Sequence, residues 1–258
     1  MVRGCAGTSR AVTTIAMPER NGDESPRFTA RLGGFFWLMV FLTGIASLRL
    51  HGKVVVPGDA AATAASILER ESLFRLALAS DVIATICYVA ATLFVYVLLK
   101  PVNRNVSLLA ALFSLMGCAA AAVGFMLHLA PLVILKGAPH LAAFTPQQLQ
   151  AQALTFLRLQ NQASGFNFVF FGLHCLLVGW LVFRSTFLPR AIGALMAVAG
   201  LGWLTSSFAN LLAPPLGKAL SPYLLIPGML GEGALTLWLL VVGVNVRRWN
   251  AAAASPRP

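Results

Sequence analysis

Long apolar runs alternate with short polar segments along most of the chain after residue 30. Each run is close to the ~20 residues that cross the hydrocarbon core of a bilayer. Backbone groups in lipid must be satisfied within their own segment, so these runs predict helices, whereas a barrel would show short alternating strands. We therefore expect an all-α, polytopic membrane helix bundle with about six transmembrane helices. The predicted spans are residues 32–48, 74–99, 106–130, 166–183, 190–212 and 223–246.

The polar segment after the first span, PGDAAATAASILERESLFR, has the pattern of a short helix. Asp59 is a suitable N-cap, because its side chain can accept a hydrogen bond from a free N–H of the first turn. Ala64, Ile67 and Leu68 follow with i, i+3, i+4 spacing and share one face. We expect an amphipathic loop helix over residues 59–71.

A second polar segment, TPQQLQAQALTFLRLQNQASGF, carries a stronger start signal. Thr145 and Gln148 have the spacing of a capping box, and Pro146 suits the first helical turn. The face opposite its apolar residues is rich in Gln, which favours a helix lying on the membrane or over the mouth of a bundle. We expect a second amphipathic loop helix over residues 146–164.

Composition supports the membrane assignment. The chain of 258 residues is 58% hydrophobic and 10% charged, against about 25% charged residues in a typical soluble domain. The spans leave room for one membrane domain, residues 31–247, between a disordered N-terminal tail, 1–30, and a C-terminal tail, 248–258. The four cysteines include no CxxC pair, so neither a zinc site nor a disulfide framework is indicated.

The formal net charge of +11 comes mostly from Lys and Arg between the spans and in the tails. More of these side chains fall on one side of the membrane when the N-terminus is inside, so the positive-inside rule places both termini in the cytoplasm. No basic stripe, aromatic interleaving or known binding module is present, and a nucleic-acid partner is therefore not indicated. The expected partner of the basic surface is the lipid bilayer with its anionic headgroups.

Several segments resemble, in order, a bacterial integral membrane family catalogued as domain of unknown function 4386. They are PGDAAATAASIL (57–68), LFRLALASD (73–81), YVLLKPVNR (96–104) and FFGLHCLLVGWLVFRSTFLPRAIGALMAVAGLGWL (170–204). The resemblance covers roughly residues 30–246 and implies a multi-pass protein of the bacterial cytoplasmic (inner) membrane. It implies no activity, and it carries over no catalytic residue and no cofactor.

Polar groups inside the spans are the candidate site residues, because ionisable groups are costly in lipid and often functional. With the N-terminus inside, most of them fall in the outer half of the membrane, and His174 falls nearest mid-depth. We expect them to line a cavity that opens to the outer leaflet and binds a small ligand. The candidate binding residues are Asp81, His128, Asn167, His174, Asn210 and Glu232.

Glu232 stands in the segment PGMLGEG, among small residues and one proline. Broken helices of this composition line the sites of transporters, and small residues also let helices pack closely. Both interpretations stay open at this point.

Two other interpretations compete with a binding site. Each polar group could be structural, with Asp81 paired to Arg75 and His174 bonded to a backbone carbonyl. Alternatively, Asp81, His128 and His174 could form a histidine–carboxylate metal site in an intramembrane lipid-modifying enzyme. A haem between the two histidines is not favoured, because they differ in depth.

Enzyme motifs such as HExxH, GxSxG and the P-loop are missing from the sequence. The leading hypothesis is a small-molecule or ion binding or transport module; the alternatives are the lipid-modifying enzyme and a structural or accessory membrane protein. The oligomeric state and the cofactor, if any, stay open.

Overall fold

A computed structural model describes residues 25–137 and 139–255, except for the side chains of residues 221 and 222. All regular structure in these residues is helical, which confirms the all-α fold. The helices are α1 (Pro26–Val54), α2 (Ala60–Glu69), α3 (Glu71–Leu99), α4 (Arg104–Leu135), a 3-10 turn (Pro139–Leu141), α5 (Pro146–Arg184), α6 (Arg190–Leu212), α7 (Pro214–Val241) and α8 (Val246–Ala254).

Six helices are long and apolar enough to cross a membrane: α1, α3, α4, α5, α6 and residues Tyr223–Val241 of α7. Contacts between neighbouring helices close these six into a ring. Going around it, α1 packs against α3, then come α4, α5, α6 and α7, and α7 returns to α1. The chain is therefore a multi-pass membrane protein whose interior is enclosed by helix faces.

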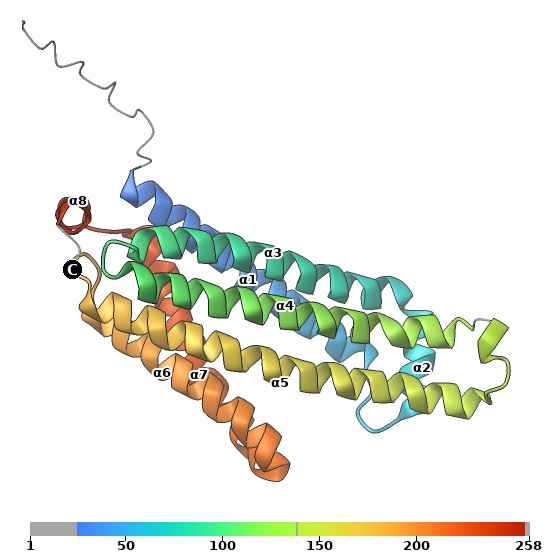
Figure 1. Cartoon of the computed structure of the whole chain (residues 1–258). Coiled ribbons are helices and arrows are strands. Elements are labelled where there is room, and N and C mark those ends of the chain that lie inside the picture. The colour runs from blue at the N-terminus through green and yellow to red at the C-terminus, as the bar shows by residue number, and fades with distance from the viewer. Residues whose placement is uncertain (1–24, 138, 256–258) are drawn as a thin grey trace, which may run out of the picture.

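The two ends of the bundle are built differently (Figure 1). At one end, on the left of the figure, lie α8 and the short connections α3–α4 and α5–α6. At the other end lie α2 and the longer α4–α5 connection with its 3-10 turn. We call these the α8 end and the α2 end.

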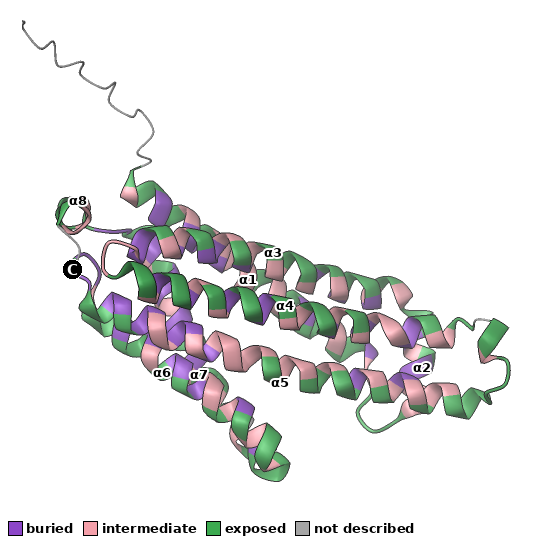
Figure 2. Ribbon diagram, viewed as in Figure 1, coloured by how far each residue is buried: buried purple, intermediate pink, exposed green. Residues whose placement is uncertain are grey.

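Buried apolar side chains gather in one large cluster and one small one. The large cluster includes Trp37, Leu98 and Leu181, and the small cluster at the α2 end is built around Ile67 and Phe74. Figure 2 shows buried residues most densely toward the α8 end, and mainly intermediate and exposed ones toward the α2 end. The bundle is thus tightly packed in one half and more open in the other.

Glycine allows a very close helix contact between α5 and α6. A Cβ on Gly179 would lie 2.7 Å from the Ala197 backbone nitrogen, and one on Gly193 would lie 2.5 Å from that of Phe183. No side chain fits in this space, so the two backbones touch directly.

The predicted loop helices have different outcomes. The first is present as α2, with the Asp59 side chain accepting from Ala62 N at 2.8 Å. The second has the predicted Thr145–Gln148 capping box, but it is not a separate helix. It continues into the fourth span, and α5 has 39 residues, about 58 Å at 1.5 Å per residue. The Gln-rich sequence does not break the helix, because Gln has a good helix propensity.

The bundle's terminal elements also differ from the predicted boundaries. Helix α1 begins at Pro26, so the described end of the predicted N-terminal tail is helical; residues 1–24 lie outside the described part. The last span ends at Val241, before Gly243 with φ of 74°. A positive φ ends a helix readily at glycine. A new helix, α8, then occupies most of the predicted C-terminal tail, capped by Asn245.

Candidate functional site

A polar cavity of about 230 Å³ lies between α1, α3, α4 and α5. Two helices supply its polar residues with the same spacing, i, i+4, i+7, which places three side chains on one helix face. Helix α4 contributes small residues, Ala121 and Gly124, and so leaves the space empty. The polar lining residues are Asp81, Thr85 and Tyr88 from α3 and Gln160, Ser164 and Asn167 from α5.

Two of these polar groups lack a hydrogen-bond partner within the described part of the chain. They are the Tyr88 hydroxyl and the Asn167 side-chain oxygen, and both atoms are buried. Buried polar groups are almost always bonded, to protein or to something held beside it. Unused hydrogen-bonding capacity therefore lies in the wall of the cavity that Asp81 also lines.

Aromatic rings form the apolar part of the wall. Phe125, Phe168 and Phe171 line the cavity, and the Tyr88 and Phe171 ring centroids are 4.5 Å apart. A carboxylate together with aromatic faces is the combination that binds organic cations in proteins.

Next to the cavity, a pair of histidines joins α1 to α4. His51 Nε2 and His128 Nδ1 are 2.9 Å apart, and His128 Nε2 lies 3.0 Å from the Phe74 carbonyl oxygen. His51 Nδ1 lies 3.0 Å from the Ser47 carbonyl oxygen and 3.2 Å from the Ser47 hydroxyl. Ser47 in turn lies beside Asp81. Hydrogen bonds thus link Ser47 through the two histidines to Phe74, and Asp81 lies next to the Ser47 end of this chain.

Two hydrogen-bond arrangements satisfy this chain, and they differ by one proton. In the first, both outer histidine nitrogens donate to carbonyls and one hydrogen is shared between the rings, so the pair carries one positive charge. Ser47 is then free to donate to Asp81. In the second, the pair is neutral and His51 Nδ1 accepts from the Ser47 hydroxyl. The Ser47 hydroxyl can therefore turn toward Asp81 in the first arrangement, whereas His51 holds it in the second.

Comparisons with known proteins identify the family. The family described as Domain of unknown function (DUF4386) matches residues 32–243. The chain belongs to this family. An uncharacterised protein from Archaeoglobus fulgidus is 26% identical over 172 residues, which cover 65% of this chain and 82% of the relative. No solved structure matches.

In this member of the family, Glu232 lies outside the cavity lining, in a closed setting. Its two carboxylate oxygens accept from Trp203 Nε1 at 2.7 Å and from Trp37 Nε1 at 3.2 Å. Helix α7 is continuous here, and a Cβ on Gly231 would lie 2.5 Å from the Leu195 carbonyl oxygen. Of the two interpretations left open for the PGMLGEG segment, the continuous helix favours close packing over a broken helix.

The other candidate residues do not form one site, although Asp81 and Asn167 line the same cavity. His174 is buried and bonds through Nδ1 to the Ala110 carbonyl oxygen at 2.9 Å. Asn210 donates to the Ser206 carbonyl oxygen one turn earlier in α6. His128 belongs to the histidine pair, while Asp81 and Asn167 line the cavity. No group of three or more His, Cys, Asp or Glu side chains within the described residues is arranged to hold a metal ion.

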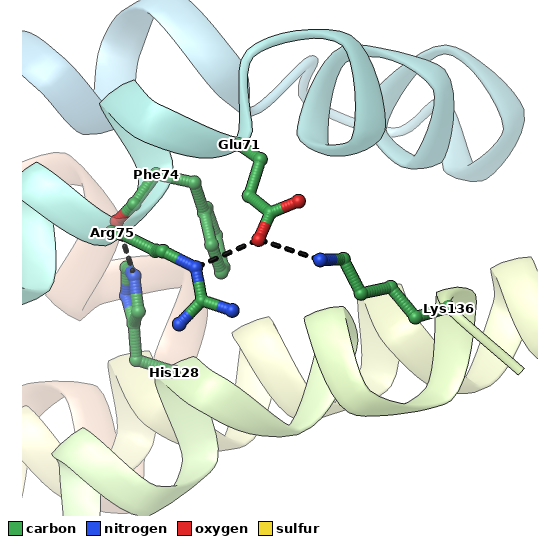
Figure 3. Close-up of polar contacts among 5 residues, drawn as sticks. All are labelled: Glu71, Phe74, Arg75, His128 and Lys136. Atoms are coloured by element: carbon green, nitrogen blue, oxygen red, sulfur yellow. Dashed lines mark hydrogen bonds and ion pairs between the residues drawn. The ribbon is translucent and has the colours of Figure 1, made fainter. Parts of the chain in front are cut away.

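Figure 3 shows the contacts that fix the start of α3 above His128. Glu71 accepts from Arg75 Nε at 2.8 Å and from Lys136 Nζ at 2.7 Å, which links α3 to the end of α4. Arg75 therefore pairs with Glu71, and it is not the partner of Asp81. The Phe74 ring stacks on the His128 ring with centroids 4.1 Å apart. Phe74 therefore contacts His128 twice, through its ring and through the carbonyl oxygen that bonds to Nε2.

Sequence reasoning did not select several residues of this region. His51 was missed because the first span was ended at residue 48, whereas α1 continues to Val54. Gln160 and Ser164 were assigned to a separate loop helix and so were not aligned with Asn167. The repeated i, i+4, i+7 polar spacing on α3 and α5 is the signal that could have found the cavity.

Proposed function

We propose that this chain is a binding or transport module for a small organic cation, and that its site is the cavity beside Asp81. The observation that carries the proposal is a cavity lined by both the Asp81 carboxylate and aromatic rings, in whose wall two polar groups also lack partners. Asp81 supplies the charge and the aromatic rings supply cation–π contacts. The volume, about 230 Å³, lies below the ~300–1,000 Å³ of pockets for drug-sized ligands, so the ligand is small.

The adjoining histidine pair supports proton-linked binding. A cation beside Asp81 competes with the positive form of the pair for the same carboxylate, through the Ser47 hydroxyl. Binding of the cation therefore favours the neutral pair and releases a proton. In a transporter, this linkage would exchange protons for the cation, with Asp81 as the shared group.

The proposal includes an orientation in the membrane. The basic α8 end supports cytoplasmic termini in the inner membrane of a bacterium, with the cavity displaced toward the outer leaflet. Reporter fusions at Arg104 and Lys136 test this orientation, and an external Arg104 would reverse it.

The test uses tetramethylammonium as a probe on the purified protein in mild detergent, measured by titration calorimetry. We expect saturable binding that Asp81→Asn removes and that the matched control Glu69→Gln, an exposed acid on α2, leaves unchanged. Equal binding of tert-butanol, a neutral molecule of similar shape, or unchanged binding in Asp81→Asn contradicts the proposal.

The proton linkage has a separate readout. Titrations in buffers of different ionisation enthalpy give the number of protons released per cation bound. We expect His128→Gln to bind the probe and to release fewer protons, since Gln can still donate to Phe74 but cannot carry the charge. An unchanged proton count contradicts the role of the histidine pair.

A further inference from the structure

A second pocket, unrelated to the proposed cation site, lies at the α8 end of the bundle. It has a volume of about 680 Å³, within the range of pockets that hold whole ligands. Three segments distant in sequence form its walls: residues 100–105 between α3 and α4, residues 184–187 between α5 and α6, and the exposed side of α8.

The pocket is strongly basic. Lys100, Arg104, Arg184 and Arg248 line it, and no acidic side chain of the described residues does. The two ion pairs among the described residues both involve Glu71 at the α2 end. None of the four cations of the pocket therefore forms an ion pair with an acidic side chain of the described residues. Four cations held together without a counter-charge repel one another, and a bound anion removes this cost.

Hydrogen bonds tie one wall of this pocket, α8, to the rest of the bundle. Helix α8 is docked on the bundle through Trp249 Nε1, which donates to the Leu98 carbonyl oxygen at 2.9 Å. Arg248 donates one N–H to the Thr186 carbonyl oxygen at 3.1 Å and keeps its other donors for a ligand. Preorganised arginine donors of this kind suit the oxygens of a phosphate group.

The depth of the pocket matches the membrane surface. The Arg184 guanidinium carbon lies 5.8 Å from the centre of the Trp180 ring, and this indole is 44% exposed on the outside of the bundle. Tryptophan and arginine at the end of a span are typical of the headgroup level. A lipid phosphate can reach the pocket from the bilayer, and a soluble phosphate compound can reach it from the aqueous side.

We infer that the basic pocket under α8, lined by Lys100, Arg104, Arg184 and Arg248, binds a phosphate-bearing anion at the membrane surface. Anionic lipid headgroups and soluble phosphate compounds share the required chemistry. The site holds the α3–α4 and α5–α6 connections together with α8 when it is occupied.

The experiment compares two charge-matched double variants of the full chain. Arg104→Gln with Arg184→Gln removes two charges from the pocket. Arg158→Gln with Lys218→Gln removes two exposed charges outside it. Delipidated protein in neutral detergent is mixed with phosphatidic acid or phosphatidylcholine and examined by native mass spectrometry. Pyrophosphate is the soluble probe, titrated by calorimetry.

Loss of two charge-assisted contacts predicts about 10- to 100-fold weaker binding in the pocket variant and unchanged binding in the control. If phosphatidic acid follows this pattern and pyrophosphate does not bind, the ligand is a lipid headgroup. If pyrophosphate follows it and phosphatidic acid does not, the ligand is soluble; if both follow it, the site accepts phosphate from either source.

Equal losses in the two double variants would show a net-charge effect and overturn the inference, as would the failure of both probes to bind the wild-type protein. Melting temperatures confirm that each variant is folded. If the pocket double variant does not fold, the single variant Lys100→Gln is compared with Lys218→Gln in the same titrations.

Discussion

Asp81 and Glu232 are both acidic residues within membrane spans, yet the bundle treats them in opposite ways. Glu232 is buried, at 9% exposure, and both its oxygens are occupied by indole N–H groups from α1 and α6. Asp81 is partly exposed to a cavity whose neighbouring polar atoms lack partners. This difference shows that an intramembrane carboxylate indicates a ligand site only when polar atoms near it have unused hydrogen-bonding capacity.

The closed region extends from Glu232 to the contact between α5 and α6, and a substitution at this close contact gives the largest expected effect. Gly193→Ala places a methyl group 2.5 Å from the Phe183 backbone nitrogen, and we expect a loss of about 3 kcal/mol of unfolding free energy. Denaturant titration in mixed micelles measures it. A loss below that of the cavity variant Gly124→Ala would contradict the packing difference between the two regions.

The next effect tests the carboxylate of the closed region. Glu232→Gln replaces one of two acceptors by an NH₂ group, so one buried indole loses its partner, at a cost of about 2 kcal/mol. The same titration measures the change. In a Trp203→Phe background the cost falls, because the unmatched donor is gone; an equal cost in both backgrounds would show that the indole bonds are not the cause.

Asp81→Asn is the matched change in the open region, and its expected effect on stability is smaller. The side chain is only partly buried, and an amide keeps hydrogen-bonding capacity toward Ser47, so we expect a change below about 1 kcal/mol. Binding of the cation probe is lost at the same time. A stability loss as large as that of Glu232→Gln would mean that Asp81 is a structural residue.

Gly124→Ala gives the smallest expected change in stability, below about 0.5 kcal/mol. Outside its own helix turn, no atom of the described residues lies within 4 Å of the added methyl group, which enters the cavity wall. Binding of tetramethylammonium should nonetheless weaken, because the methyl group takes up ligand space. Thermal melting and calorimetry separate the two effects, and unchanged binding would place the ligand elsewhere.

Much of the fold follows from the sequence, because each span must satisfy its own backbone and cover its own length of lipid. The helix caps at Asp59 and Thr145 could also be predicted, because capping depends on neighbouring residues in the sequence. Which face of each helix points into the bundle could not be predicted, since it depends on contacts between distant segments. The partners of Glu232 lie 195 and 29 residues away, and nothing local to PGMLGEG identifies them.

The candidate site was predicted only in part for a related reason. Asp81 and Asn167 stand out singly as polar residues in apolar runs, and they do line one cavity. Their neighbours Thr85, Tyr88 and Ser164 are common residue types in membrane helices and attract no attention alone. They indicate a site only when their spacing places them on one helix face. On α5 this spacing was missed, because one helix was predicted as two.

The link between α6 and α7 limits how these two helices can move. Only Ala213 separates the last residue of α6, Leu212, from the first residue of α7, Pro214. Any movement of α7 relative to α6 must therefore pivot at this residue. Opening the pair about that pivot would break the hydrogen bond from Trp203 to Glu232, which joins the two helices farther along.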